Sequence, residues 1–65
     1  MKERILKLLR ERSPQTTAEI AQKVGLSWHT AHERLLELQV EGKIRRMKVG
    51  GRHLWFYEEG SDAGK

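Results

Sequence analysis

The chain opens with a run of apolar residues at the spacing of an amphipathic helix: Ile5-Leu6-Lys7-Leu8-Leu9. Ile5 and Leu9 fall at the centre of one helical face, so this face should pack on the rest of the molecule. Pro14 follows soon after, and a proline pushes the residue before it out of the helical region. We therefore expect the first helix to end near Arg12.

A second, shorter helix is predicted to start at Thr16-Thr17-Ala18-Glu19, which is a capping-box pattern. In such a box the Thr16 hydroxyl accepts a hydrogen bond from the Glu19 amide, and the Glu19 carboxylate accepts one from the Thr16 amide. The apolar stripe of this helix consists of Ile20, Ala21 and Val24. Gly25 suits the left-handed position just past its end.

The tripeptide Gly25-Leu26-Ser27 predicts a tight turn into a third helix. Leu26 should point inward, and Ser27 is a suitable N-cap. In the helix that follows, Ala31, Leu35 and Leu38 share one face. Ala31 is small enough to let the second helix approach closely, and Gly42 marks the end of the third helix.

After Gly42 the pattern changes from helical to extended. Gly50-Gly51 separates the extended runs 43–49 and 52–57, which predicts a β-hairpin whose two loop residues take positive φ. The loop places Val49 opposite Arg52, Met47 opposite Leu54, Arg46 opposite Trp55 and Ile44 opposite Tyr57. One face then holds Ile44, Trp55 and Tyr57, and the other holds Met47, Leu54 and Phe56. Both faces are apolar, so the sequence leaves open which of them covers the helices.

Size narrows the functional classes. The chain has 65 residues and no cysteine. A chain of this length buries only about 60% of the surface that its unfolded form exposes, so function should lie on the surface. We expect one domain over 1–59 and a disordered tail over 60–65. No apolar run approaches the roughly 20 residues that cross a bilayer, and no signal-peptide segment is present, which predicts a cytoplasmic, nucleoid-associated protein with no membrane contact.

Positive charge is concentrated in one segment. The chain has 13 Lys+Arg against 9 Asp+Glu, and residues 43–53 alone carry a net charge of +5 with no acidic residue. A positive field focused on a short stretch is typical of a polyanion-binding surface. The alternative is a charged face that is merely solvated.

The order helix, short helix, tight turn, helix and basic hairpin resembles a small α+β winged helix-turn-helix domain. The residues that carry the resemblance are 17–27, Thr30-Ala31, Leu35, Leu38, 41–46 and Val49-Gly50-Gly51-Arg52. The resemblance covers 5–57 and is to compact prokaryotic transcriptional regulators, especially the small archaeal and archaeal-virus type. It implies that the third helix, about 27–41, enters the major groove of double-stranded DNA, while the hairpin, 43–57, forms a wing on the backbone or minor groove.

Carried over by position, the resemblance assigns six residues of the third helix to DNA: Ser27, Trp28, His29, Thr30, His32 and Glu33. A histidine can donate to guanine and a glutamate can accept from cytosine. No Arg or Lys lies among these residues, which differs from commoner members, so base readout should be modest. Phosphate contacts should supply the affinity, and they are assigned to Thr16, Thr17, Lys43, Arg45, Arg46, Lys48, Arg52 and His53.

Several apolar residues have a second interpretation. Trp28 borders the core face of its helix, which favours packing under the turn over contact with DNA. The run Trp55-Phe56-Tyr57 is better explained by core and sheet packing than by a base-stacking platform, because a domain this small needs every aromatic residue. Leu36 and Val40 form an apolar pair roughly opposite the core face, and either the wing or a partner covers them.

The sequence offers little support for a metal site or a catalytic site. His29 and His32 are three residues apart, but two histidines leave a tetrahedral shell incomplete unless His53 or a second subunit helps, so no metal or cofactor is predicted. No catalytic nucleophile, base and oxyanion donors are assembled, so we expect neither an enzyme nor a small-molecule substrate. The alternatives are a protein-interaction or assembly module and a binder of non-B-form duplex or structured RNA. A homodimer is a further expectation, and the absence of Asn and Cys hints at a thermophilic source.

Overall fold

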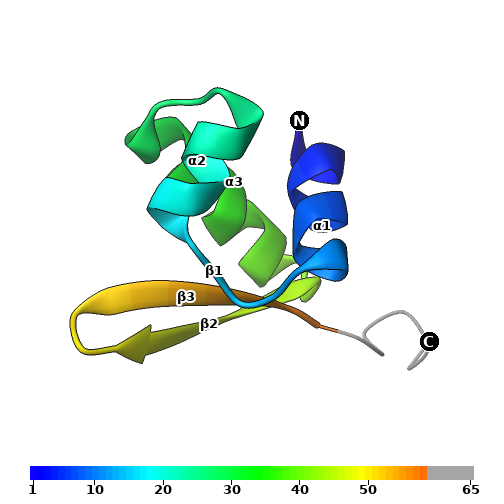
Figure 1. Cartoon of the computed structure of the whole chain (residues 1–65). Helices are drawn as coiled ribbons and strands as arrows, with labels where there is room; N and C mark the ends of the chain where they lie inside the picture. Colours follow the sequence, from blue (N-terminus) through cyan, green and yellow to red (C-terminus); the bar gives the residue numbers. More distant parts are fainter. Residues whose placement is uncertain (59–65) are drawn as a thin grey trace.

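The computed structural model describes residues 1–58. Three helices lie above a small antiparallel sheet, and one end of the sheet projects beyond the helices as a wing (Figure 1). The elements are α1 (Lys2–Glu11), β1 (Gln15–Thr16), α2 (Thr17–Val24), α3 (Trp28–Val40), β2 (Ile44–Val49) and β3 (Arg52–Tyr57). The predicted α+β winged-helix architecture is confirmed; the tail predicted for 60–65 lies outside the described residues.

Local signals set the helix boundaries as predicted. At the start of α2 the Thr16 hydroxyl accepts from the Glu19 amide at 3.1 Å, and the Thr16 amide donates to the Glu19 carboxylate at 2.9 Å. Gly25 follows α2 in the left-handed conformation with φ of 75°. The Ser27 hydroxyl then caps α3 by accepting from the Thr30 amide at 3.3 Å. The helix-turn-helix is therefore fixed by short-range capping chemistry.

The hairpin has the predicted register. Val49 pairs with Arg52, Met47 with Leu54, Arg46 with Trp55 and Ile44 with Tyr57. Both turn residues, Gly50 and Gly51, have positive φ, at 54° and 83°. This backbone conformation matches the twist of the two strands, which explains why two glycines separate them.

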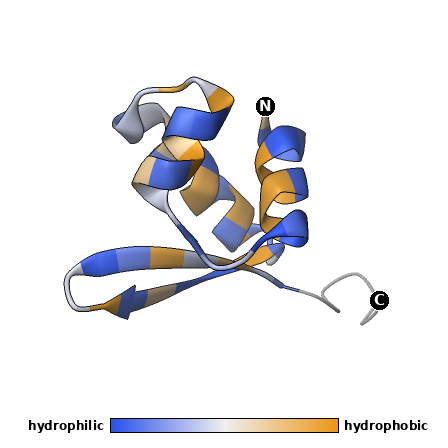
Figure 2. Cartoon of the chain, in the orientation of Figure 1, coloured by the Kyte–Doolittle hydropathy of each residue, from blue (hydrophilic) through white to orange (hydrophobic). Residues whose placement is uncertain are grey.

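The sheet covers the helices with the face that carries Ile44, Trp55 and Tyr57. Ile44 and Trp55 are buried and Tyr57 packs against the core, whereas Met47 and Val49 on the opposite face are about half exposed. Figure 2 shows the apolar positions of the helices turned toward the centre of the molecule. The buried residues from the helices are Ile5, Leu9, Ile20, Ala21, Val24, Ala31, Leu35 and Leu38. The preference for packing roles is confirmed for Trp55 and Tyr57; Phe56 is only partly buried.

A third strand, β1, was not predicted. Gln15 and Thr16 pair with Trp55 and Leu54, so β3 lies between β1 and β2. The Gln15 side chain is buried, and its amide donates to the carbonyls of Leu8 and Arg12 at 3.2 and 2.8 Å. These bonds satisfy a buried polar group and tie the link between α1 and α2 to the sheet.

One buried hydrogen bond joins the wing to the helix-turn-helix. The indole Nε1–H of Trp55 donates to the hydroxyl of Thr17 at 2.7 Å, between side chains that are 0% and 2% exposed. Trp55 lies in the middle of β3, and Thr17 is the first residue of α2. The bond therefore fixes the position of the wing relative to the second helix.

Candidate nucleic-acid interface

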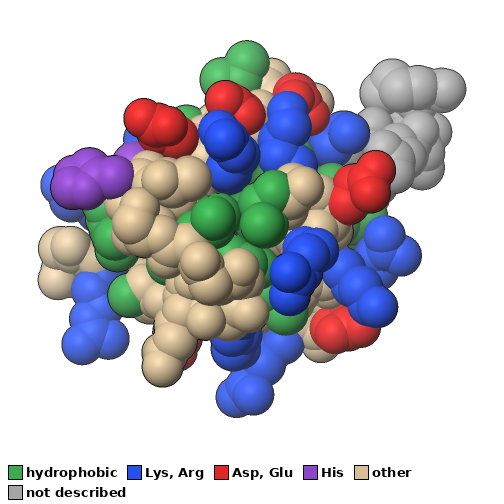
Figure 3. Space-filling model, turned by 90° about the horizontal axis from the view of Figure 1, so that it is seen from above, with side chains coloured by type: hydrophobic (Ala, Val, Ile, Leu, Met, Phe, Trp, Pro, Cys, Tyr) green, Lys and Arg blue, Asp and Glu red, His purple; other side chains and the backbone are tan. Residues whose placement is uncertain are grey.

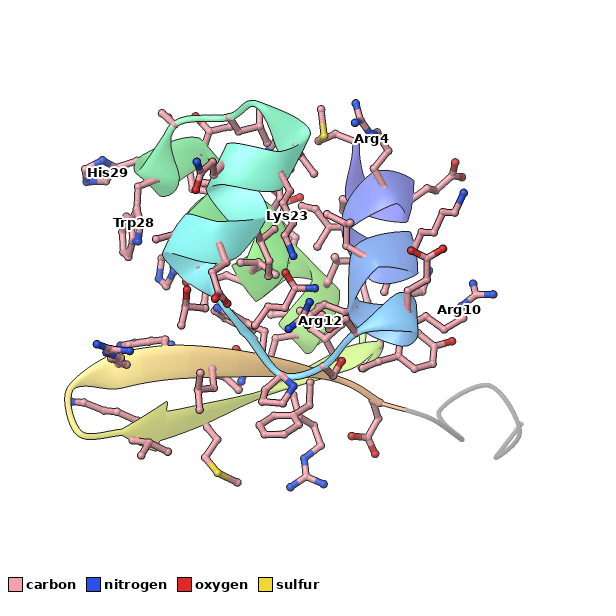
Figure 4. The ribbon with its side chains drawn as sticks, in the orientation of Figure 1. Arg4, Arg10, Arg12, Lys23, Trp28 and His29 are labelled. Atoms are coloured by element: carbon pink, nitrogen blue, oxygen red, sulfur yellow. The ribbon has the colours of Figure 1, made fainter. Side chains whose placement is uncertain are left out.

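A cleft of about 470 Å³ separates the helix-turn-helix from the tip of the wing. It is lined by the start of α2 (residues 16–19), by Trp28 at the start of α3 and by the wing tip (residues 51–53). We call it the wing cleft. In Figure 4 the indole of Trp28 points from the first turn of α3 toward the wing, whereas His29 points outward from the same turn. The cleft thus brings together two segments that the sequence assigned to DNA.

An aromatic cluster connects α3 with the wing beside this cleft. The rings of Trp28 and His32 are stacked, with centroids 4.7 Å apart and planes at 13°. His32 also meets the edges of His53 and Trp55, at centroid distances of 5.7 and 5.9 Å. His29 meets Trp28 edge-on at 5.5 Å. These contacts hold the Trp28 ring in one orientation.

Trp28 corrects one interpretation of the sequence. We expected the indole to fill space under the turn, but it is 46% exposed. Its position on the helix borders the core face, and the residue of the turn that packs against the core is Leu26. Trp28 instead presents a large aromatic surface to solvent. Sequence position alone missed this, because the wheel angle of Trp28 is compatible with either side of the boundary.

The histidines of the cluster are placed differently from one another. His29 is exposed, whereas His32 is partly buried between Trp28 and the wing. Burial lowers the pKa of His32 below its usual 6.5, and the neighbouring His53, Arg46 and His29 lower it further. The Nδ1 atoms of His32 and His53 have no hydrogen-bond partner. His53 does lie beside His32, yet within residues 1–58 no three potential ligands gather closely enough to hold a metal ion.

The cations of the wing are divided between its two faces. By strand alternation Arg46 and Lys48 lie on the face of Trp55, toward the helices, and the Arg46 guanidinium carbon is 5.9 Å from the Trp55 ring centroid. Arg52 contributes to the wing cleft. Arg45 lies on the opposite face, 3.5 Å from the Glu58 carboxylate. Arg46, Lys48 and His53 therefore share the helix-facing side of the wing and Arg52 reaches the cleft from the wing tip, whereas Arg45 is separated from them.

Lys43 and the two threonines have structural partners. The Lys43 ammonium is 3.6 Å from Glu41 at the base of the wing. Thr17 is buried, and its hydroxyl is occupied by Trp55, so that hydroxyl is unavailable to phosphate. Thr16 uses its hydroxyl and amide in the capping box. Both threonines still border the wing cleft.

The remaining predicted residues lie in the first turns of α3. Ser27 is exposed and donates its hydroxyl proton to Thr30 at 2.9 Å, so both hydroxyls serve the cap. Glu33 is exposed. The apolar pair predicted farther along α3 is divided: Leu36 packs against the core, whereas Val40 is 87% exposed. The exposed candidates for contact with a ligand are thus Trp28, His29 and Glu33.

Three residues of the wing cleft were not assigned to the site from the sequence: Ala18, Glu19 and Gly51. The capping box contained the signal for Glu19, because it places this carboxylate at the start of α2. From the sequence, the N-terminus of α2 was assigned to phosphate binding, although the Glu19 carboxylate places a negative charge there. An anion would therefore approach the side of the cleft that carries Arg52.

The helical side opposite the wing has a different charge pattern. Seen from above, acidic side chains lie among the Lys and Arg side chains (Figure 3). Ion pairs involve α1 and α3: Lys2 is 2.8 Å from Glu41 and 3.6 Å from Glu37, and Arg34 is 3.6 Å from Glu37. The hydrogen bond between Lys2 and Glu41 raises the pKa of Lys2 and lowers the pKa of Glu41. Mixed charge on this side leaves the wing as the segment with a single sign of charge.

Comparison with known proteins gives a family. Residues 1–59 match a family model described as FaeA-like protein. This is a family of winged-helix-like regulators, which supports the predicted resemblance at that level; the archaeal type stays a prediction. The comparison with curated proteins finds no match. Among the described residues, no helix has the length and apolar character needed to span a bilayer.

Proposed function

We propose that this chain, which belongs to the FaeA-like protein family, is a transcriptional regulator that binds double-stranded DNA. The observation that carries the proposal is the position of the wing tip, residues 51–53 at the end of the +5 segment 43–53, beside the exposed first turn of α3. A basic ribbon next to an exposed helix start is the arrangement that contacts phosphates and a groove together. A chain with this role would work at the nucleoid.

In this proposal α3 enters the major groove with its first turns. His29 and Glu33 are exposed there, and they offer a donor and an acceptor to base edges. His32 is held between Trp28 and the wing, so it orients the aromatic cluster more than it reads bases. With no Arg or Lys at 27–33, sequence preference should be modest compared with bidentate contacts to guanine.

Affinity in this proposal comes from the wing. Arg46 and Lys48 lie on the helix-facing side, and Arg52 lies at the tip. Each phosphate contact releases counterions, so the slope of log K against log salt changes by about 0.9 for each contact. With about six contacts, including backbone amides, the slope for the wild type should be about −5.

The experiment measures duplex binding by fluorescence anisotropy over a range of salt concentrations. Lys48→Ala should make the slope shallower by about 0.9 for duplexes of any sequence. Lys7→Ala is the matched control, because it removes the same charge from an exposed position on α1. If affinity for duplex does not depend on salt, or if both variants change the slope equally, the assignment of DNA to the wing is wrong.

Selection of bound fragments from a random duplex pool tests the role of α3. A preferred site should emerge, and its preference at one base position should relax in His29→Ala. Two half-sites at a fixed spacing would indicate binding as a homodimer. A pool that shows no enrichment would limit the function to binding without sequence preference.

A further inference from the structure

Contact between the wing and phosphates does not explain why an exposed tryptophan, Trp28, lines the wing cleft. Of the two tryptophans, Trp55 is fully buried while Trp28 is 46% exposed and borders the cleft. An exposed indole loses apolar burial that a domain of 65 residues needs. We infer that the wing cleft binds one nucleotide, with the base stacked on Trp28 and the phosphate held by Arg52. The inference rests on the proposed function only for the source of that nucleotide.

The Trp28 ring is already held in place for stacking. His32 covers one of its faces, with planes at 13°, and His29 meets it edge-on at 84°. His32 is itself held by contacts with His53 and Trp55 on the wing. The base would stack on the face of Trp28 that His32 leaves free. A ring that is fixed before binding loses little conformational entropy when a base stacks on it.

The size and charge of the wing cleft suit a nucleotide. Its volume of about 470 Å³ falls in the range of small-molecule sites. Arg52 is exposed, and no carboxylate within residues 1–58 lies close enough to form an ion pair with it. A guanidinium without a partner is well suited to a phosphate, which it can bind through two parallel hydrogen bonds.

Glu19 gives the cleft a preference among bases. One oxygen of its carboxylate accepts from the Thr16 amide at 2.9 Å, and a carboxylate retains further acceptor capacity beyond one bond. An acceptor beside a stacked base favours the bases with an exocyclic amino group, namely adenine, cytosine and guanine, over thymine. The same negative charge directs the phosphate away from Glu19 and toward Arg52.

The nucleotide has two possible sources with the same chemistry. One is a free mononucleotide, and the other is an unpaired nucleotide displaced from DNA. Stacking on an aromatic side chain does not require a particular sequence, because every base offers a flat face. Both sources would place the base and the phosphate in the same positions, so the experiment has one arm for each.

The first arm uses ¹⁵N–¹H NMR of the two indole N–H groups with dAMP as the probe. The Trp55 signal belongs to a buried group bonded to Thr17, and Trp28→Phe identifies the other signal by its loss. Addition of dAMP should shift the Trp28 signal in a saturable way, while deoxyribose 5-phosphate should not. Arg52→Ala should weaken dAMP binding about tenfold, which corresponds to 1.4 kcal/mol, and dTMP should bind more weakly than dAMP.

The second arm compares two duplexes of the same sequence, one fully paired and one with a single extra adenine. Wild-type protein should bind the duplex with the unpaired base about tenfold more tightly. Trp28→Ala should lose this ratio, whereas Lys7→Ala, on α1 and outside the lining of the cleft, should keep it. Far-UV circular dichroism checks that each variant is folded.

The outcomes separate this inference from the proposed function. A shift of the Trp28 signal by dAMP, or a preference for the unpaired base that depends on Trp28, supports the nucleotide site. If neither is observed, the inference is wrong, and a steep salt dependence for paired duplex would still support DNA binding. If duplex binding does not depend on salt while dAMP binds beside Trp28, the proposed function fails and the nucleotide site stands.

Discussion

Replacing Thr17 with valine tests the bond that positions the wing. Valine keeps the shape of the side chain but removes the hydroxyl that accepts the Trp55 indole N–H at 2.7 Å. Both residues are almost fully buried, so water has no access to replace the lost acceptor. Thr17→Val therefore leaves a buried donor without a partner, which is more costly than removing both partners together.

The expected loss follows from the burial of the donor. An unsatisfied buried N–H costs about 1–3 kcal/mol. A domain of this size has a free energy of unfolding of about 3–10 kcal/mol at the usual stability per residue. A loss of about 2 kcal/mol should therefore lower the melting temperature by about 8–16 °C. Thr17→Ser keeps the hydroxyl and removes one methyl group, so it should cost only about 0.8 kcal/mol.

Urea unfolding followed by circular dichroism measures both variants. The midpoint should fall further for Thr17→Val than for Thr17→Ser, with the same dependence on denaturant in each case. Hydrogen exchange of the Trp55 indole N–H should become faster in Thr17→Val only. If valine changes the free energy of unfolding by less than about 0.5 kcal/mol, or serine costs as much as valine, the hydroxyl does not stabilise the fold as argued.

Two further predictions concern the turn and the histidine cluster. Gly25→Ala should lower the free energy of unfolding by about 1–2 kcal/mol, because φ is +75° at this position. An added Cβ meets no neighbour, so the cost is conformational. Unchanged stability in urea would refute this prediction. Because the pKa of His32 lies below the 6.5 of the unfolded chain, the unfolded state takes up its proton first as the pH falls. The free energy of unfolding should therefore decrease from neutral pH down through 6.5 toward the lowered pKa of folded His32, and His32→Gln should decrease less. Equal pH dependence of the two proteins in urea unfolding would show that another group is responsible.

The candidate site was predicted less completely than the fold. The sequence indicated the segments that meet at the wing cleft, since their order and charge follow from the chain itself. It did not separate Arg45, which pairs with Glu58, from Arg46 and Lys48, which lie toward the helices. It also counted Thr17 as a contact, although this side chain is buried against Trp55. Each difference depends on a partner that the local sequence does not specify.

Helix ends, the turn after α2 and the register of the wing were determined by the sequence alone. Capping by Thr16 and Ser27, the left-handed Gly25 and the pair Gly50-Gly51 act over a few residues, so their effect can be predicted from neighbours in the chain. Only the tertiary structure decided which face of the wing is buried, that β1 joins the sheet and that Trp28 is exposed. Both faces of the wing are apolar, so local preferences balance, and packing against residues distant in sequence selects the outcome.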